Sequence, residues 1–235
     1  MEKIVEKFNI FDLFTMMLPG IIISGTLFIS LSFKYYDIWK EYGNEKYILF
    51  FIFSYLCGVI FQEIGTFLDK RFMHRILYGG EPREIYLSAD KYEKIFDNKL
   101  SYKNVLKIKN YLEKYIDFEG FDNENEREVN SLMFSYCLNI CEKNGLTWKA
   151  DKMMVISEMS RSLFWGSLVS IALNLIMIFG FSYHILFLYL EIPFLIVISF
   201  IFLCRKKRYE RYRIRIVLRM FIIHNVQEKA NDSQR

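Results

Sequence analysis

The chain has 235 residues, of which 53% are hydrophobic, 18% are aromatic and 25% are charged, and its formal net charge at pH 7 is +4. The apolar and the charged residues lie in long separate blocks, which excludes an ordinary water-soluble domain, where both classes are mixed along the chain. A bilayer core of roughly 30 Å is crossed by about 20 helical residues. Four such blocks predict an all-α membrane protein with four transmembrane helices and a small helical cytoplasmic domain between the second and the third.

The N-terminal part predicts an interfacial helix followed by the first transmembrane helix. Residues 1–14 carry apolar side chains at helical spacing between charged ones, which is typical of an amphipathic helix at a membrane surface. Residues 15–33 follow without a charge. Pro19 and Gly20 interrupt this stretch, because proline lacks the backbone donor and crowds the preceding turn. Two interpretations stay open: a bend between the interfacial and the spanning helix, or a hinge used in gating.

Residues 47–68 predict the second transmembrane helix, in which Glu63 is the only charged residue. Glu63 lies near the expected cytoplasmic end, shortly before Lys70 and Arg71. It fits an interfacial acid close to these bases. It also fits an acidic ring at the inner mouth of a pore, because rings of acids favour cations in channels.

The central segment, residues 69–161, predicts a helical cytoplasmic domain of roughly 90 residues, a size at which a domain is marginally stable. Three helical patterns lie within it, and Gly145 is suited to end the second. The third, residues 148–162, runs without a helix breaker into residues 162–181, a charge-free stretch that predicts the third transmembrane helix. One long helix is therefore expected to enter the membrane from the cytoplasm.

Residues 185–204 predict the fourth transmembrane helix, joined to the third by a tight turn at residues 182–184. Its single charge is Glu191, and an ionised carboxylate facing lipid there costs roughly 2.5–3.5 kcal/mol. The carboxyl is expected to line a pore or a subunit interface, to be a neutral hydrogen-bonded acid, or to mark a displaced end of the span. Asn174 is expected to form hydrogen bonds between helices. The candidate pore-lining residues are Glu191, Glu63 and Asn174.

Eight basic residues fall within residues 205–219, interleaved with Tyr209 and Tyr212. Positive charge at this boundary is required by topology and attracts anionic headgroups. Aromatic rings between bases also suit single-stranded nucleic acid or a nucleotide. The candidate ligand-binding residues join this run to the start of the central segment, and they are Lys70, Arg71, Arg75, Arg205, Lys206, Arg208, Arg211 and Arg215.

The C-terminal tail is expected to continue as a helix that buries one face. Its apolar stripe is Ile214, Val217, Leu218 and Phe221. The stripe is expected to pack on this chain's cytoplasmic domain or on a neighbouring subunit, and residues 228–235 are expected to be disordered.

The lysines and arginines beside the spans place both termini and the central segment in the cytoplasm, as in a multi-pass protein of the cell inner membrane in contact with the lipid bilayer. The expected organisation is an interfacial helix at 1–14, transmembrane helices 1 and 2 at 15–68, the cytoplasmic domain at 69–161, a transmembrane hairpin of helices 3 and 4 at 162–204, and a basic helix with a disordered end at 205–235.

No catalytic or cofactor signature is present: the sequence contains no G-x-S-x-G, P-loop, H-E-x-x-H or dinucleotide fingerprint. The four cysteines form no C-x-x-C pair and are expected to be buried free thiols. The sequence therefore predicts neither an enzyme, nor a metal site, nor a cofactor.

The layout resembles the small membrane effectors of bacterial anti-phage systems, with the transmembrane effector of Hailong defence systems as the nearest match. The strings that carry the resemblance are FNIFDLFTMMLPG, FQEIGTFLDKRF and SEMSRSLFWGSL. The resemblance implies an oligomeric channel held shut by DNA oligomers that a partner nucleotidyltransferase makes. It assigns a role to no individual residue.

The expected function is a homo-oligomeric channel, with a tetramer favoured, that is gated by a cytoplasmic nucleotide or oligonucleotide and serves anti-phage defence. Several copies are expected because four helices form a narrow bundle with little lumen. The alternative is a non-conducting membrane sensor or scaffold that docks a cytosolic partner.

Overall fold

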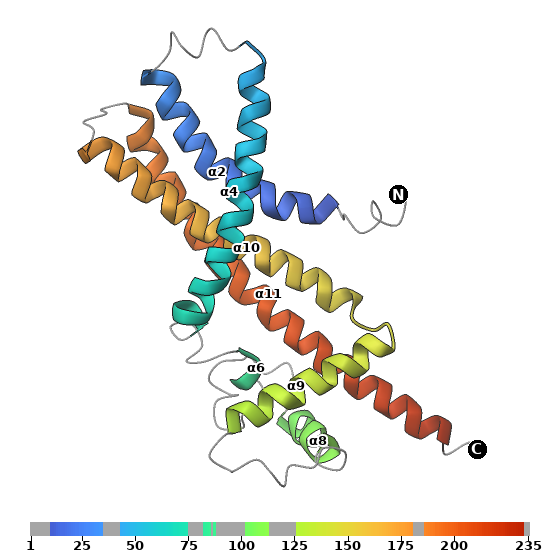
Figure 1. The fold of residues 1–235 in the computed structure, drawn as a ribbon. Coiled ribbons are helices and arrows are strands. Elements are labelled where there is room, and N and C mark those ends of the chain that lie inside the picture. The colour runs from blue at the N-terminus through green and yellow to red at the C-terminus, as the bar shows by residue number, and fades with distance from the viewer. Residues whose placement is uncertain are drawn as a thin grey trace. The chain divides into compact units, whose positions relative to one another are not determined.

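The computed structural model is entirely helical in the residues that it describes, and none of them lies in a strand (Figure 1). The described residues are 10–34, 43–74, 82–85, 87, 102–112, 126–180 and 186–232. This confirms the all-α prediction. The chain divides into two compact units: the first unit is Met1–Leu68 with Val155–Lys207, and the second unit is Asp69–Met154 with Arg208–Arg235.

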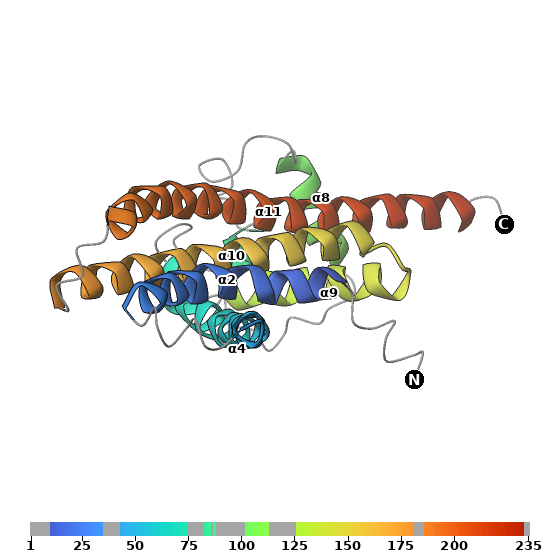
Figure 2. The ribbon, with the colours of Figure 1, turned by 90° about the horizontal axis from the view of Figure 1, so that it is seen from above.

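Helices of the first unit are long and apolar. They are α2 (Ile10–Lys34), α4 (Glu45–Leu68), most of α10 (Trp148–Leu175) and the first half of α11 (Leu186–Asp232). The π-helical turns η1 (Asp69–Met73) and η3 (Ile176–Gly180) extend α4 and α10. Figure 2 shows α10 lying between α11 and α2.

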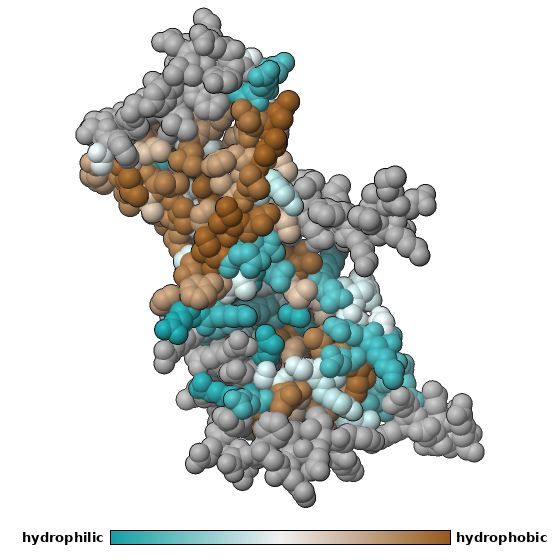
Figure 3. All heavy atoms as spheres, in the orientation of Figure 1, coloured by the Kyte–Doolittle hydropathy of each residue, from teal (hydrophilic) through white to brown (hydrophobic). Residues whose placement is uncertain are grey.

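Three of these helical stretches are long and apolar enough to cross a membrane: Glu45–Met73, Trp148–Gly180 and Leu186–Gln227. Helix α2 has 25 residues and carries a shorter apolar stretch, Thr15–Ile29. The first unit leaves large apolar side chains of α4 and α11 exposed, which Figure 3 shows as a brown surface. Exposure on this scale is typical of a surface that lipid or another protein covers.

Helix α2 runs through Pro19 without a break in its helical assignment. The expected interfacial helix and the first span therefore belong to one helix from Ile10 onward, and residues 1–9 lie outside the described part. Pro19 still removes the amide that would bond to the Thr15 carbonyl. Figure 1 shows the ribbon of α2 changing direction along its length, as a proline inside a helix produces.

The crossing of α2 and α4 is built from small residues. Gly20 and Ser24 of α2 meet Ser54 and Gly58 of α4, and the Oγ atoms of the two serines lie 2.5 Å apart. A Cβ atom on Gly20 would overlap the Ser54 carbonyl oxygen, and one on Gly58 would overlap the Met16 carbonyl oxygen. Two helices carrying small residues four positions apart can approach backbone to backbone, which is a common device of helix packing in membranes.

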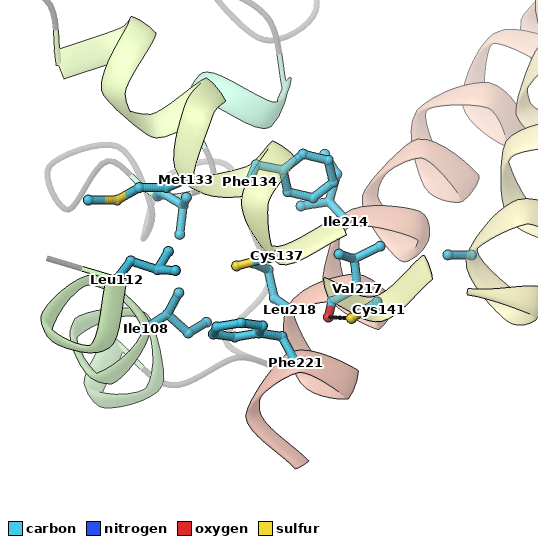
Figure 4. Packing of buried hydrophobic residues seen from close by; sticks show 12 residues of the cluster. Ile108, Leu112, Met133, Phe134, Cys137, Cys141, Ile214, Val217, Leu218 and Phe221 are labelled. Carbon is cyan, nitrogen blue, oxygen red and sulfur yellow. Dashed lines mark hydrogen bonds between the residues drawn. The ribbon is translucent and has the colours of Figure 1, made fainter. Parts of the chain in front are cut away.

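The second unit has its own hydrophobic core. Its elements are α6 (Pro82–Ile85), α8 (Tyr102–Leu112), α9 (Glu126–Lys143), the start of α10 and the end of α11. Figure 4 shows the apolar stripe of α11 facing side chains of α8 and α9, and the residues drawn include Ile108, Leu112, Met133, Phe134, Cys137, Ile214, Val217, Leu218 and Phe221. The stripe therefore packs on this chain's own helical unit, as the first of its two interpretations predicted.

Gly145 ends α9 as predicted. Its φ is +66°, in the left-handed region that glycine adopts without a Cβ clash. The Gly145 N–H donates to the Glu142 carbonyl and the Leu146 N–H donates to the Cys141 carbonyl, at 3.0 and 2.8 Å. These two bonds form a Schellman cap, which turns the chain toward α10.

Both predicted long helices are continuous. Helix α10 and η3 run from Trp148 to Gly180 without interruption. Helix α11 has 47 residues and continues to Asp232, so the prediction of disorder from residue 228 was wrong for residues 228–232. These residues contain no glycine or proline, so nothing in the sequence stops the helix there. The predicted turn at residues 182–184 lies outside the described residues.

Candidate functional site

Glu191 of α11 is held by side chains from two other helices of the first unit. Its Oε1 lies 2.7 Å from Oγ1 of Thr26 on α2, and its Oε2 accepts a hydrogen bond of 3.1 Å from Nδ2 of Asn174 on α10. Thr26 is 1% exposed and Asn174 is 0% exposed, whereas Glu191 is partly buried. The acid thus joins α2, α10 and α11 at one point inside the apolar unit.

The face of α10 that leads to this site is made of small side chains. Ser162, Gly166, Ser170 and Asn174 follow one another at four-residue intervals, and all four are buried. A Cβ on Gly166 would lie 3.3 Å from the Pro19 carbonyl oxygen, so α10 packs closely against α2. This close packing brings the short amide of Asn174 within reach of the carboxyl on α11.

Most hydroxyl groups of the first unit are bonded within their own helix. Ser24, Ser54, Ser160, Ser167 and Ser199 each donate to the carbonyl four residues earlier, at 2.7–2.8 Å. Such back-bonding is the usual solution for serine in an apolar helix. These groups therefore need no water or partner from another helix.

Three other polar atoms on α10 are buried without a hydrogen-bond partner in the described part of the chain: the hydroxyls of Ser162 and Ser170 and the Oδ1 of Asn174. All three lie on the face that carries Asn174. The surroundings of Glu191 are therefore polar but uncharged, since neither Thr15–Ile29 of α2 nor residues 162–180 contain a charged side chain.

The structure brings together two of the three candidate pore-lining residues. The predicted role of Asn174 in bonding between helices is confirmed by its contact with Glu191. Glu63 is exposed on α4, and its place in a pore stays a prediction. Thr26 was missed by sequence reasoning, because a threonine in an apolar helix gives no signal until its partner is known.

The candidate ligand-binding residues separate into exposed and buried groups. Lys70 and Arg71 are exposed in η1, and Arg205 and Arg208 are exposed on α11. Arg211 is half-buried, and Arg75 lies outside the described residues.

Two residues predicted to bind a ligand are buried instead, with Lys206 at 2% and Arg215 at 8% exposed. The Arg215 guanidinium lies 5.3 Å from the centre of the Tyr212 ring, in cation–π contact. The cause for Arg215 is helical periodicity, since it neighbours Ile214 and Leu218 on the face that enters the core.

An ion pair in the second unit was not anticipated from the sequence. His74 Nε2 lies 3.2 Å from Glu210 Oε1, and both side chains are largely buried. Glu210 is the single acid in the basic run, and this contact ties α11 to the segment that follows η1.

Two cysteines of α9 are buried in the second core, as predicted for free thiols. Burial, followed by the charge of Glu142, raises the pKa of Cys141 from its ordinary value of 9.0 to about 11. Burial raises the pKa of Cys137 well above its usual range. Among the described residues, no group of three or more His, Cys, Asp or Glu side chains is placed to hold a metal ion.

No protein-family model matches the chain, and neither a curated protein nor a solved structure matches it.

Proposed function

We propose that this chain is a multi-pass membrane protein that conducts ions as an assembly of several copies and acts as an anti-phage effector. The observation that carries the proposal is Glu191, an acid within the apolar half of α11 that is bound by Thr26 and Asn174. Ionisable groups inside membrane proteins are rare and costly, and they characteristically mark ion or proton pathways. The defence role is supported by the resemblance in layout.

The bonding of Glu191 suits a gate. Its two partners lie on separate helices, so any rearrangement that opens a path between α2, α10 and α11 releases the carboxyl to water. A released carboxylate attracts cations, and several copies around one axis place several carboxylates together. Cation selectivity is the expected consequence.

The ligand is expected to be an anionic nucleotide or oligonucleotide, bound by the exposed bases Lys70, Arg71, Arg205 and Arg208. Guanidinium groups bind phosphate through paired hydrogen bonds. Helices α10 and α11 each supply residues to both units without a break in the helix. A ligand that displaces either helix in the second unit therefore has a continuous helix through which to act on the first.

The second candidate is a non-conducting membrane sensor or scaffold. It is favoured by the same contacts seen differently: the hydrogen bonds of Glu191 come from its own chain, so the acid needs no lumen to be satisfied. In this case the carboxyl stabilises the bundle, and the exposed bases dock a partner.

Ion flux in liposomes that contain the purified protein separates the two functions. Under the channel proposal, Glu191→Gln changes cation flux or selectivity while the protein still reaches the membrane, because the isosteric amide keeps the contacts and removes the charge. Glu63→Gln is the matched control on the exposed face of α4. Absence of current with every nucleotide and oligonucleotide tested would leave the scaffold as the function.

A further inference from the structure

The hydroxyl of Thr26 has two oxygen neighbours but only one proton. Its Oγ1 lies 2.7 Å from Glu191 Oε1 and 3.1 Å from the Ile22 carbonyl oxygen. A threonine hydroxyl donates one hydrogen bond and can accept two. Because the Ile22 carbonyl only accepts, the positions of the protons around Thr26 depend on whether Glu191 is ionised.

With an ionised Glu191, the proton of Thr26 points to the carboxylate. The 3.1 Å contact with the Ile22 carbonyl then holds no proton and brings two acceptor oxygens together. With a protonated Glu191, the carboxyl donates to Thr26, Thr26 donates to Ile22, and Asn174 donates to the other carboxyl oxygen. Every short contact then contains one proton, and the threonine bonds to its own helix as Ser24 and Ser54 do.

We propose that Glu191 is a proton-binding site, occupied while α2, α10 and α11 are in contact. The amide of Asn174 is consistent with this in either orientation, because nitrogen and oxygen of an amide are assigned from hydrogen bonds and not observed directly. As placed, Nδ2 donates to Oε2 and the Oδ1 atom has no partner among the described residues. If the amide is rotated, Oδ1 requires a proton from the acid.

The surroundings offer no charge that would favour the ionised form. Thr15–Ile29 of α2 and residues 162–180 of α10 and η3 contain no titratable side chain. On α11 the neighbouring titratable group is Tyr189. A carboxylate here would have two neutral donors and no cation, whereas an uncharged acid costs far less in an apolar environment.

The proton becomes a control element if the helices separate. Water that reaches the carboxyl stabilises its ionised form, so opening releases a proton and raising the pH favours opening. This link to gating rests on the proposed channel function, whereas the presence of the proton rests only on the contacts of Glu191 and on its apolar surroundings.

Infrared spectroscopy of the full-length protein in liposomes at pH 7 tests the proposal, because a carboxylic acid and a carboxylate absorb at different frequencies. The spectrum of the wild type minus that of Glu191→Gln is expected to contain the C=O band of one carboxylic acid, with a shift after exchange into D2O. A carboxylate band in its place would overturn the proposal.

Two threonine variants test the hydrogen bond itself. Thr26→Val removes the acceptor but preserves the shape, so the acid band is expected to move to higher frequency without being lost. Thr66→Val is the control, because Thr66 donates to the Gln62 carbonyl at 2.8 Å and its removal leaves the band in place. An acid band that ignores Thr26→Val contradicts the proposed arrangement.

A measurement on the wild type alone covers the case in which a variant does not fold. Dicyclohexylcarbodiimide, a lipid-soluble reagent, reacts with protonated carboxyls, and peptide mass spectrometry locates the adduct. An adduct is expected on Glu191 at pH 7, and its absence overturns the proposal. Since neither readout uses conduction, an acid band without current refutes only the channel, and current without an acid band refutes only the proton site.

Discussion

Glu191 illustrates how far a single residue can be interpreted from its position in the chain. Its cost inside an apolar span was evident, and it required a partner, water or a proton. The identity of the partners was not evident, because Thr26 lies 165 residues away in sequence and Asn174 lies 17 away. Which faces of three helices turn toward one another depends on packing, and that packing selects a hydrogen-bonded acid within one chain.

The thiol of Cys141 is predicted to be unreactive in the folded protein. Its pKa of about 11 lies about two units above the ordinary value of 9.0, so the reactive thiolate is about a hundredfold scarcer at pH 8. The thiol also donates to the Val217 carbonyl at 3.6 Å, the dashed contact in Figure 4. Iodoacetamide labelling followed by peptide mass spectrometry is expected to modify Cys141 at least a hundredfold more slowly in the native protein than in denaturant.

The same pKa gives the pH dependence of the second unit a sign. A pKa that is higher in the folded state means that the unfolded chain loses its proton first as the pH rises. The stability due to the buried thiol is complete below about pH 9 and is lost as the pH rises through about 11. Equal labelling of the native and the denatured protein at pH 8 would contradict this burial.

At the scale of elements, the crossing of α2 and α4 is set by four small residues. Gly20 and Ser24 on one helix and Ser54 and Gly58 on the other share the same four-residue spacing. The spacing is visible in the sequence, but an isolated pair of small residues in an apolar helix is too common to predict a crossing. The pairing becomes specific only when both backbones are seen to approach at these positions.

Gly58→Ala is predicted to separate α2 from α4. The added Cβ would overlap the Met16 carbonyl oxygen, and backbone cannot yield as a flexible side chain does. Overpacking of this kind costs about 1–3 kcal/mol or more. Thermal unfolding in detergent is expected to show a clearly lower midpoint for the variant.

The matched control is Gly25→Ala on α2, where an added Cβ meets nothing within 4 Å. Alanine is favoured over glycine inside a helix by about 0.5–1 kcal/mol, so this variant is expected to unfold at the same or a higher temperature. A Gly58→Ala protein as stable as Gly25→Ala would show that the two helices do not approach closely.

At the scale of the whole molecule, the number of membrane crossings decides which side each part faces. Three helical stretches meet the length and hydropathy of a span, and α2 is the fourth candidate. At about 1.5 Å per residue its 25 residues are long enough to cross a hydrocarbon core of roughly 30 Å. Four crossings place both termini on the same side, whereas three place them on opposite sides.

We predict that both termini are cytoplasmic, because the basic residues after Cys204 retain that end inside and α2 makes the number of spans even. Tags at the two ends of the protein, expressed in bacterial cells, are expected to be protected together from a protease added outside. A tag inserted in the loop at residues 35–42 is the control and is expected to be cleaved. Cleavage of the N-terminal tag alone would establish three crossings.

The amino-acid sequence by itself determined the helical class, the positions of the long apolar helices, the cap at Gly145 and the buried stripe of α11. These features depend on local propensity and periodicity, which are properties of neighbouring residues. Only the tertiary structure decided that Thr26 and Asn174 bind Glu191, that small residues pair across α2 and α4, and that Lys206 and Arg215 are buried. Such contacts join residues distant in the chain, and close packing selects them because each fixes where the others can lie.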